Sequence, residues 1–194
     1  MSIAVDTRLR MSLEEFLDWP GDGRARHHRL IDGEVRPMSP ASATHSMIQL
    51  EIGVLLARSI ADARPPFRAL TEAAIVPGAR SATNLRVADL AVTRARVAAG
   101  QIAVPDPVLV VEILSPGNER ETREALRAYA TVPTVREILV VRSTEIAAEI
   151  LRRGADDGWP NAPEVVGPGG SLRLDSVGLT CAIEDFYDGT HLVA

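Results

Sequence analysis

Apolar runs with the length of β-strands are the clearest pattern in this chain. Residues 68–76, 86–92, 107–114 and 136–143 are mostly Val, Leu, Ile and Ala, and residues rich in Gly, Pro and Asn separate them. Such runs predict buried strands. The segment 147–153 is expected to pair antiparallel with 136–143, and the Gly- and Pro-rich stretch 154–170 is expected to be an exposed loop.

A second pattern predicts helices between these strands. Apolar residues recur at helical spacing from Ser42 to about Ala61, with a stripe wide enough for a helix covered on more than one side. Ser12 and Glu15 form a capping box for a short helix, and a further helix is expected from Glu121 to Thr131. A last short helix is expected near AIEDFYDG (182–189).

Asp32-Gly33 adds a tight hairpin between two short strands, because both turn positions tolerate positive φ. The order helix, hairpin, long helix, strands, helix, strand predicts an α/β fold, a three-layer sandwich with a mixed central β-sheet flanked by helices. We expect one domain over residues 1–194, in which residues 1–11 form a poorly ordered extension.

Two of the strands are each interrupted by one carboxylate, Asp89 in RVADLAV and Glu112 in PVLVVEIL. A buried ionised carboxylate costs several kcal/mol unless it is paired or binds a cation. A shared Mg²⁺ or Mn²⁺ would compensate both acids, because hard cations prefer oxygen ligands. In the alternative, each acid pairs with an arginine such as Arg86 or Arg136.

Composition and charge narrow the class of protein. The net charge of −5 argues against a protein that coats nucleic acid nonspecifically, and all 21 basic residues other than histidine are arginines. The single cysteine, Cys181, allows no intramolecular disulfide, and no apolar run is long enough to span a bilayer. We therefore expect a cytoplasmic protein without a membrane partner.

Several segments resemble the Uma-type endonuclease family, which falls within the PD-(D/E)xK restriction-endonuclease-like superfamily. They are LIDGEVRPMSPASATHSMI (30–48), RVADLAV (86–92), VVEILSPGN (110–118) and LRAYATVPTVREILVV (126–141). The resemblance implies a restriction-endonuclease-like fold. It also implies a divalent cation held by Asp89, Glu112 and the backbone carbonyl of Ile113, with Glu34 assisting. Glu34 as an ordinary exposed hairpin residue is the alternative.

Two further residues are candidates for substrate contact. His45 shares a helix face with Ile48 and Ile52, so it points toward the interior or an adjoining cleft, where it would contact a phosphate or hold a buried hydrogen bond. Arg29 closes a basic cluster with Arg24, Arg26, His27 and His28, which would bind a nucleic-acid backbone or form a solvated loop.

The superfamily's lysine is missing. Leu114 stands at its usual position, and Ala125 stands where Uma-type relatives carry the migrated lysine. Arg123 and Arg127 are expected to point to solvent from the opposite helix face. Arg86, three residues before Asp89, is the better candidate to replace the lysine, although an arginine cannot act as a general base.

These observations lead to one prediction and one alternative. The chain is expected to be a metal-dependent endonuclease, acting on nucleic acid and specifically on DNA, as a homodimer by analogy. The alternative is a catalytically impaired domain that binds nucleic acid or a protein through the retained fold.

Overall fold

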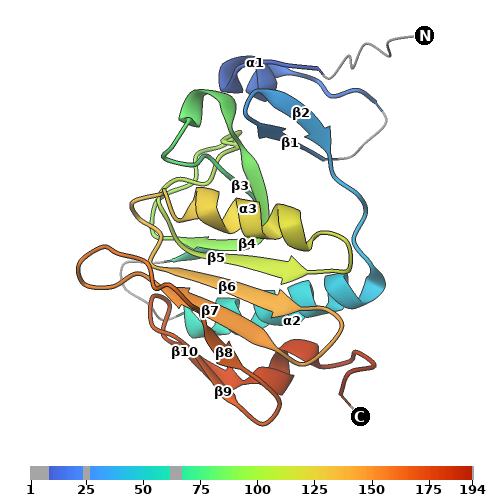
Figure 1. The fold of residues 1–194 in the computed structure, drawn as a ribbon, viewed down its shortest axis with the longest axis vertical. Coiled ribbons are helices and arrows are strands. Elements are labelled where there is room, and N and C mark those ends of the chain that lie inside the picture. The colour runs from blue at the N-terminus through green and yellow to red at the C-terminus, as the bar shows by residue number, and fades with distance from the viewer. Residues whose placement is uncertain (1–8, 24–26, 62–66, 194) are drawn as a thin grey trace.

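A six-stranded mixed sheet lies at the centre of the computed structural model, which describes residues 9–23, 27–61 and 67–193 (Figure 1). The strand order is β3-β4-β5-β6-β7-β8, and only β5 and β6 run parallel. The strands are β3 (Arg68–Ile75), β4 (Arg86–Thr93), β5 (Pro107–Leu114), β6 (Glu137–Arg142), β7 (Ala148–Arg152) and β8 (Glu164–Val166).

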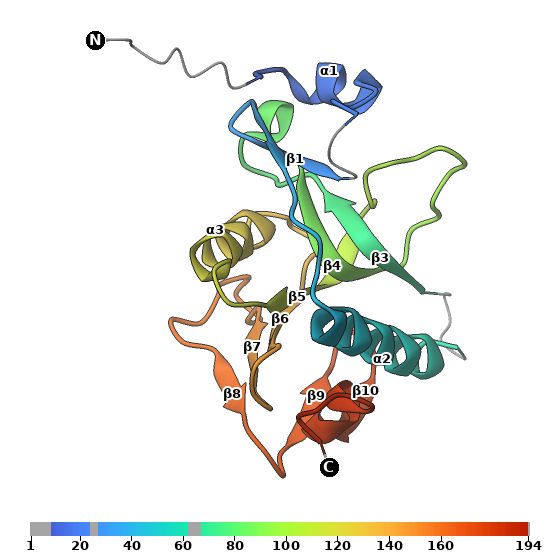
Figure 2. The ribbon, with the colours of Figure 1, turned by 90° about the vertical axis from the view of Figure 1, so that its right-hand side faces the viewer.

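Helices cover the two faces of this sheet (Figure 2). The helix α2 (Ala43–Ser59) lies on one face, where Ile48, Ile52 and Leu56 pack against apolar side chains of β4 and β5. The helix α3 (Glu119–Tyr129) lies on the other face. The predicted three-layer α/β architecture is therefore confirmed.

Smaller elements flank these layers. The short helix α1 (Leu13–Asp18) begins at the predicted capping box, in which the Ser12 Oγ accepts from the Glu15 N–H at 3.2 Å. The remaining elements are the hairpin β1 (His28–Ile31) and β2 (Glu34–Pro37), the 3₁₀ turn η1 (Ser81–Thr83), the hairpin β9 (Ser171–Leu174) and β10 (Leu179–Ala182), and the terminal 3₁₀ helix η2 (Ile183–Tyr187).

Local sequence signals account for the turns that connect these elements. Asp32 and Gly33 both have positive φ, 50° and 81°, as the predicted hairpin turn requires. α3 buries Thr122, Ala125, Leu126 and Tyr129, the same four residues that the helical spacing places on its inner stripe.

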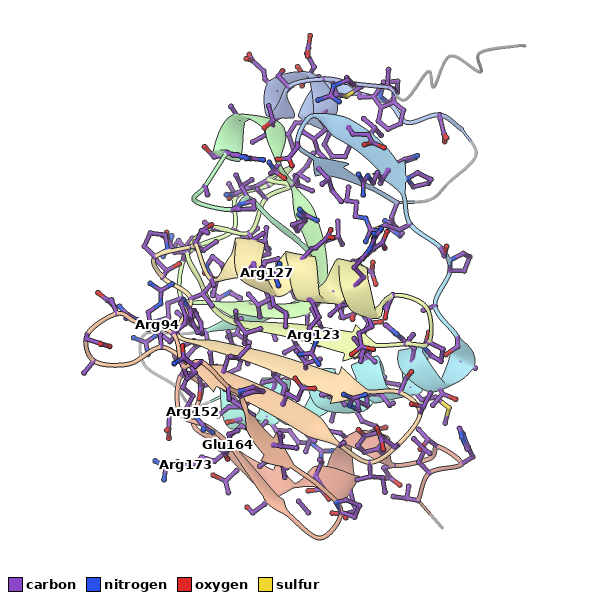
Figure 3. All side chains as sticks on the ribbon, in the orientation of Figure 1. Arg94, Arg123, Arg127, Arg152, Glu164 and Arg173 are labelled. Atoms are coloured by element: carbon purple, nitrogen blue, oxygen red, sulfur yellow. The ribbon has the colours of Figure 1, made fainter. Side chains whose placement is uncertain are left out.

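One detail differs from the sequence prediction. The expected loop 154–170 contains β8, which pairs antiparallel with β7, and Arg152 of β7 donates a hydrogen bond to Glu164 of β8 (Figure 3). The expectation that α2 is covered on more than one side is confirmed, because α2 packs against the central sheet and also against η2 and β10. Leu50 lies outside these contacts and is 63% exposed.

Residues 1–8 of the expected N-terminal extension lie outside the described residues. Leu9 and Met11 lie alongside the β1–β2 hairpin. The Val35 N–H donates to the Leu9 carbonyl at 2.9 Å, and the Met11 N–H donates to the Gly33 carbonyl at 2.8 Å. None of the described helices has the length and apolar character needed to cross a membrane.

Candidate active site

Asp89 lies where β4 and β5 separate. The pairing of these strands extends only as far as Leu90 and Val111, so Asp89 is one residue beyond the last pair. Its carboxylate fills the gap, because Oδ2 accepts a hydrogen bond from the Ile113 N–H at 2.6 Å. A side chain thus replaces the missing ladder contact on β5, which explains how this carboxylate is tolerated in an apolar strand.

His45 fixes the other oxygen of Asp89 from the α2 face. The imidazole is only 7% exposed, as the helical spacing predicts, and its Nε2 lies 2.9 Å from Asp89 Oδ1. Its Nδ1 lies 3.1 Å from the Ser115 Oγ. Ser115, His45 and Asp89 are therefore hydrogen-bonded in series, and this series sets the orientation of the carboxylate.

Glu112 lies on the opposite, α3-facing side of the sheet. The Tyr129 hydroxyl donates a 2.6 Å hydrogen bond to Glu112 Oε1. Burial and, after it, the negative charge of Asp89 together raise the pKa of Glu112 to about 8, although the Tyr129 hydrogen bond opposes the shift. The two acids therefore interact electrostatically across the gap between β4 and β5.

The backbone of β5 offers a third oxygen to this gap. The Leu114 carbonyl accepts from the Ser143 N–H at 2.9 Å, so Leu114 faces β6. Backbone polar groups alternate sides along a strand, and the Ile113 N–H already points to Asp89. The Ile113 carbonyl is consequently directed toward β4, the side from which the Asp89 carboxylate approaches.

Arginines do not neutralise either acid directly in the described part of the chain. Their side chains bond to His45, the Ile113 N–H and Tyr129, and Gln49 donates to the Asp89 carbonyl. Arg136 instead donates to Asp157 at 2.7 Å. The alternative in which Arg86 or Arg136 pairs with these acids is therefore wrong.

Glu72 and Gln49 also belong to this neighbourhood, and the sequence analysis missed both. The β3–β4 register places Glu72 opposite Asp89, and Gln49 Nε2 donates to the Asp89 carbonyl at 2.8 Å and to Glu72 Oε1 at 3.2 Å. The charge of Glu72 also raises the pKa of Glu112. Its positive φ of 48° is unusual for a non-glycine residue. Glu72 is an acidic residue within the apolar run 68–76, and this is the sequence signal that could have identified it as a site residue.

The other predicted site residues lie around β1 and β2. Glu34 bonds Arg36 Nη2 at 3.1 Å. Arg29 donates to Glu121 of α3, and its charge lowers the pKa of Glu112. Arg24 and Arg26 of the expected basic cluster lie outside the described residues.

The positions that matter for the missing lysine are on α3 and β4. Ala125 is buried on the inner face of α3, and Arg86 is only 8% exposed on β4. The prediction that Arg123 points to solvent is wrong, because it donates to both oxygens of Glu149, at 2.5 and 2.7 Å. Arg127 is exposed, as predicted.

The donor chemistry of this gap fits a hard divalent cation. Two carboxylates and a carbonyl are oxygen ligands, and a buried acid with a raised pKa lacks a compensating positive charge. Within the described residues, no group of three or more His, Cys, Asp and Glu side chains could hold an ion. Any cation at this gap would therefore need backbone oxygen or water in addition to Asp89 and Glu112.

Comparisons with known proteins agree with this architecture. The model of the Uma2 family, described as "Putative restriction endonuclease", matches residues 13–184. A protein of Synechocystis sp. named uncharacterized protein slr1290 is 28% identical over 185 residues, which cover 93% of each chain. The crystal structure of a "putative nuclease belonging to DUF820" from Anabaena variabilis has a TM-score of 0.71 and 21% identity, and it covers 91% of this chain and 97% of that one. The chain therefore belongs to the Uma2 family of restriction-endonuclease-like proteins.

Proposed function

We propose that this protein is a divalent-cation-dependent endonuclease that hydrolyses phosphodiester bonds of DNA. The observation that carries the proposal is that Asp89 accepts a hydrogen bond from the Ile113 N–H where β4 and β5 separate, while its charge raises the pKa of the buried Glu112. Family membership supports the nuclease class. Mg²⁺ or Mn²⁺, the DNA substrate and the residue roles belong to the proposal.

Asp89, Glu112 and the Ile113 carbonyl would hold the cation. A bound cation of this type polarises a phosphoryl oxygen and lowers the pKa of an attacking water. The chain itself contributes orientation: His45 and the Ile113 N–H fix Asp89, and Tyr129 fixes Glu112. Glu34 would assist from the hairpin. His45 would orient Asp89 rather than contact the phosphate, because Asp89 and Ser115 occupy both of its ring nitrogens.

A homodimer is part of the proposal, because two strands of duplex DNA require two cuts and symmetric pairing of subunits supplies two sites. Sedimentation velocity with and without a DNA duplex tests it. A monomer under both conditions would restrict the activity to nicking or single strands.

The test of the function is cleavage of supercoiled, linear and single-stranded DNA with Mg²⁺ or Mn²⁺. We expect wild-type protein to cut, and Asp89→Asn and Glu112→Gln to lose at least about 100-fold in rate, because each removes one charged ligand. Glu51→Gln, which removes a carboxylate on α2 that is not a candidate ligand, is the matched control and should cut like wild type.

The second candidate function is a catalytically impaired nucleic-acid-binding or protein-binding domain. The specific observation in its favour is the pKa of Glu112 near 8, which keeps this acid protonated at neutral pH without a cation. Ala125, at the migrated lysine position, supports the same view. This candidate predicts no cleavage by wild type on any of the three DNA forms, and unchanged DNA binding in Asp89→Ala.

A further inference from the structure

Three arginines lie side by side across neighbouring strands on the hairpin side of the site. The β1–β2 register pairs Arg29 with Arg36. Leu30 and Leu85 exchange two backbone hydrogen bonds of 2.9 Å in an antiparallel bridge, so the next position of that register sets Arg29 opposite Arg86. Directly opposed residues project from the same face of a sheet. We call Arg36, Arg29 and Arg86 the arginine row.

Like charges placed directly opposite each other across strands are destabilising, so a row of three cations needs compensation. Part of it comes from two carboxylates, since Glu34 bonds Arg36 at 3.1 Å and Glu121 of α3 bonds Arg29. Asp32 and then Glu124, which lies on α3, act on Arg86 only through their longer-range charges. Arg86 is therefore the member of the row without a directly bonded carboxylate.

Arg86 is the most anomalous member of the arginine row. It is 92% buried, yet among the described residues its side chain makes neither a hydrogen bond nor an ion pair, and its Nε is buried without a partner. The Nε of Arg29 is likewise buried without a partner. Burial and the nearby charge of Arg29 both lower the pKa of Arg86, although the ionisable Tyr129 opposes this shift. A buried guanidinium without an anion is costly to retain for stability alone.

The arginine row ends beside the candidate active site. Arg86 belongs to the same strand as Asp89, and Ala88, on the same face of β4 as Arg86, packs in the cluster that α3 covers. Tyr129 affects the charge of Arg86, and Arg29 affects that of Glu112. Guanidinium groups bind phosphate oxygens with paired, planar hydrogen bonds. An anion bound by Arg29 and Arg86 would therefore lie next to Glu112.

We propose that Arg36, Arg29 and Arg86 form a phosphate-binding row that holds the nucleic-acid backbone next to Glu112 and takes the place of the absent lysine. The inference rests on the proposed function for the kind of ligand, while the binding itself requires neither a metal nor cleavage. Arg86 would contact the phosphate nearest the acids, and Arg36 would contact the outermost one.

The test is fluorescence anisotropy with a labelled DNA oligonucleotide in EDTA, over a series of salt concentrations. We expect Arg86→Met to weaken binding about 10-fold or more. It should also reduce the slope of log affinity against log salt concentration by the amount that corresponds to about one phosphate contact. Arg36→Gln, at the exposed end of the arginine row, should reduce the same slope with a smaller loss of affinity. Arg127→Met removes the same charge from the outer surface of α3 and should bind like wild type.

Urea denaturation of the same variants separates binding from folding. Because Arg86 is a buried cation without a resident partner, Arg86→Met should unfold at an equal or higher urea concentration than wild type. Unchanged affinity and slope in both Arg86→Met and Arg36→Gln would overturn the proposal. A lower urea midpoint in Arg86→Met, with normal binding by Arg36→Gln, would also overturn it, because Arg86 would then be structural.

Inorganic phosphate, at matched ionic strength, distinguishes the two sources of a phosphate group. Displacement of DNA by phosphate in wild type but not in Arg86→Met supports the arginine row as the shared site. Stabilisation by phosphate without any DNA binding would overturn the nucleic-acid assignment. A protein that binds DNA through the arginine row without cutting would support this inference and contradict only the proposed hydrolysis. Cutting that Arg86→Met leaves unaffected would support the proposed hydrolysis and contradict this inference.

Discussion

Glu112 is a buried acid whose protonation is tied to folding. Its pKa is raised from 4.5 to about 8, first by burial and then by the charge of Asp89. In the unfolded chain this carboxyl ionises near pH 4.5, so between about pH 4.5 and 8 the folded state holds a proton that the unfolded state has released. Stability contributed by the protonated form is therefore fully present below pH 4.5 and is lost as pH rises toward 8.

This linkage predicts a pH dependence that belongs to one side chain. In EDTA, the free energy of unfolding of wild type should fall between pH 5 and 8 by up to the order of 1 kcal/mol per pH unit. Glu112→Gln should flatten that decline, since glutamine does not titrate. Urea denaturation at each pH measures both proteins, with Glu51→Gln as a carboxylate control that keeps the wild-type slope. The same slope in Glu112→Gln would show that another group is responsible.

At the scale of elements, one ion pair connects α3 to β7 on the face of the sheet that α3 covers. Arg123 donates to both oxygens of Glu149 on β7, and Arg142 of β6 adds a 3.2 Å bond to Glu149 Oε1. Figure 3 labels Arg123 and Arg127 on the same helix, yet only Arg123 reaches this carboxylate. Bidentate geometry makes such a pair more than an ordinary surface contact.

The pair supplies a matched comparison along one helix. We expect Arg123→Met to lower the free energy of unfolding by about 1 kcal/mol, a value that allows for screening because Arg123 is one-third exposed. Arg127→Met should change it by less than about 0.5 kcal/mol, as for other surface substitutions. Urea denaturation at low and high salt tests both, and the Arg123 effect should shrink at high salt. Equal effects of the two substitutions would contradict an anchoring role for the Glu149 pair.

The same elements show which features a sequence can predict. Apolar runs, the Asp32-Gly33 turn and the inner stripe of α3 are local patterns, and each appears in the structure where its spacing places it. The arginine row is not local, because Arg36, Arg29 and Arg86 meet only through the bridge between Leu30 and Leu85. The contact of Arg123 with Glu149 depended on the position of β7 under α3, which helical geometry alone does not give.

At the scale of the whole molecule, the candidate site lies between the two halves of the core. Side chains of β4 and β5 pack toward α2 on one face and toward α3 on the other. Asp89 is fixed from the α2 face by His45, and Glu112 from the α3 face by Tyr129. A cation shared by the two acids would connect both faces, so its binding energy should appear in the stability of the entire fold.

The expected result is a rise of the melting temperature with Mg²⁺. At a Mg²⁺ concentration of about 100 times Kd, linkage gives about 2.7 kcal/mol, which corresponds to an increase of roughly 5–10 °C for a chain of this length. The increase should be larger at pH 8 than at pH 6, because Glu112 must lose its proton to bind the ion and its pKa is about 8. Differential scanning calorimetry of wild type and Asp89→Asn, with NaCl at equal ionic strength as the control, measures it. If Mg²⁺ shifts the melting temperature of both proteins equally, the ion binds elsewhere. The two carboxylates would then be a repulsive pair maintained for folding or for binding a positively charged partner.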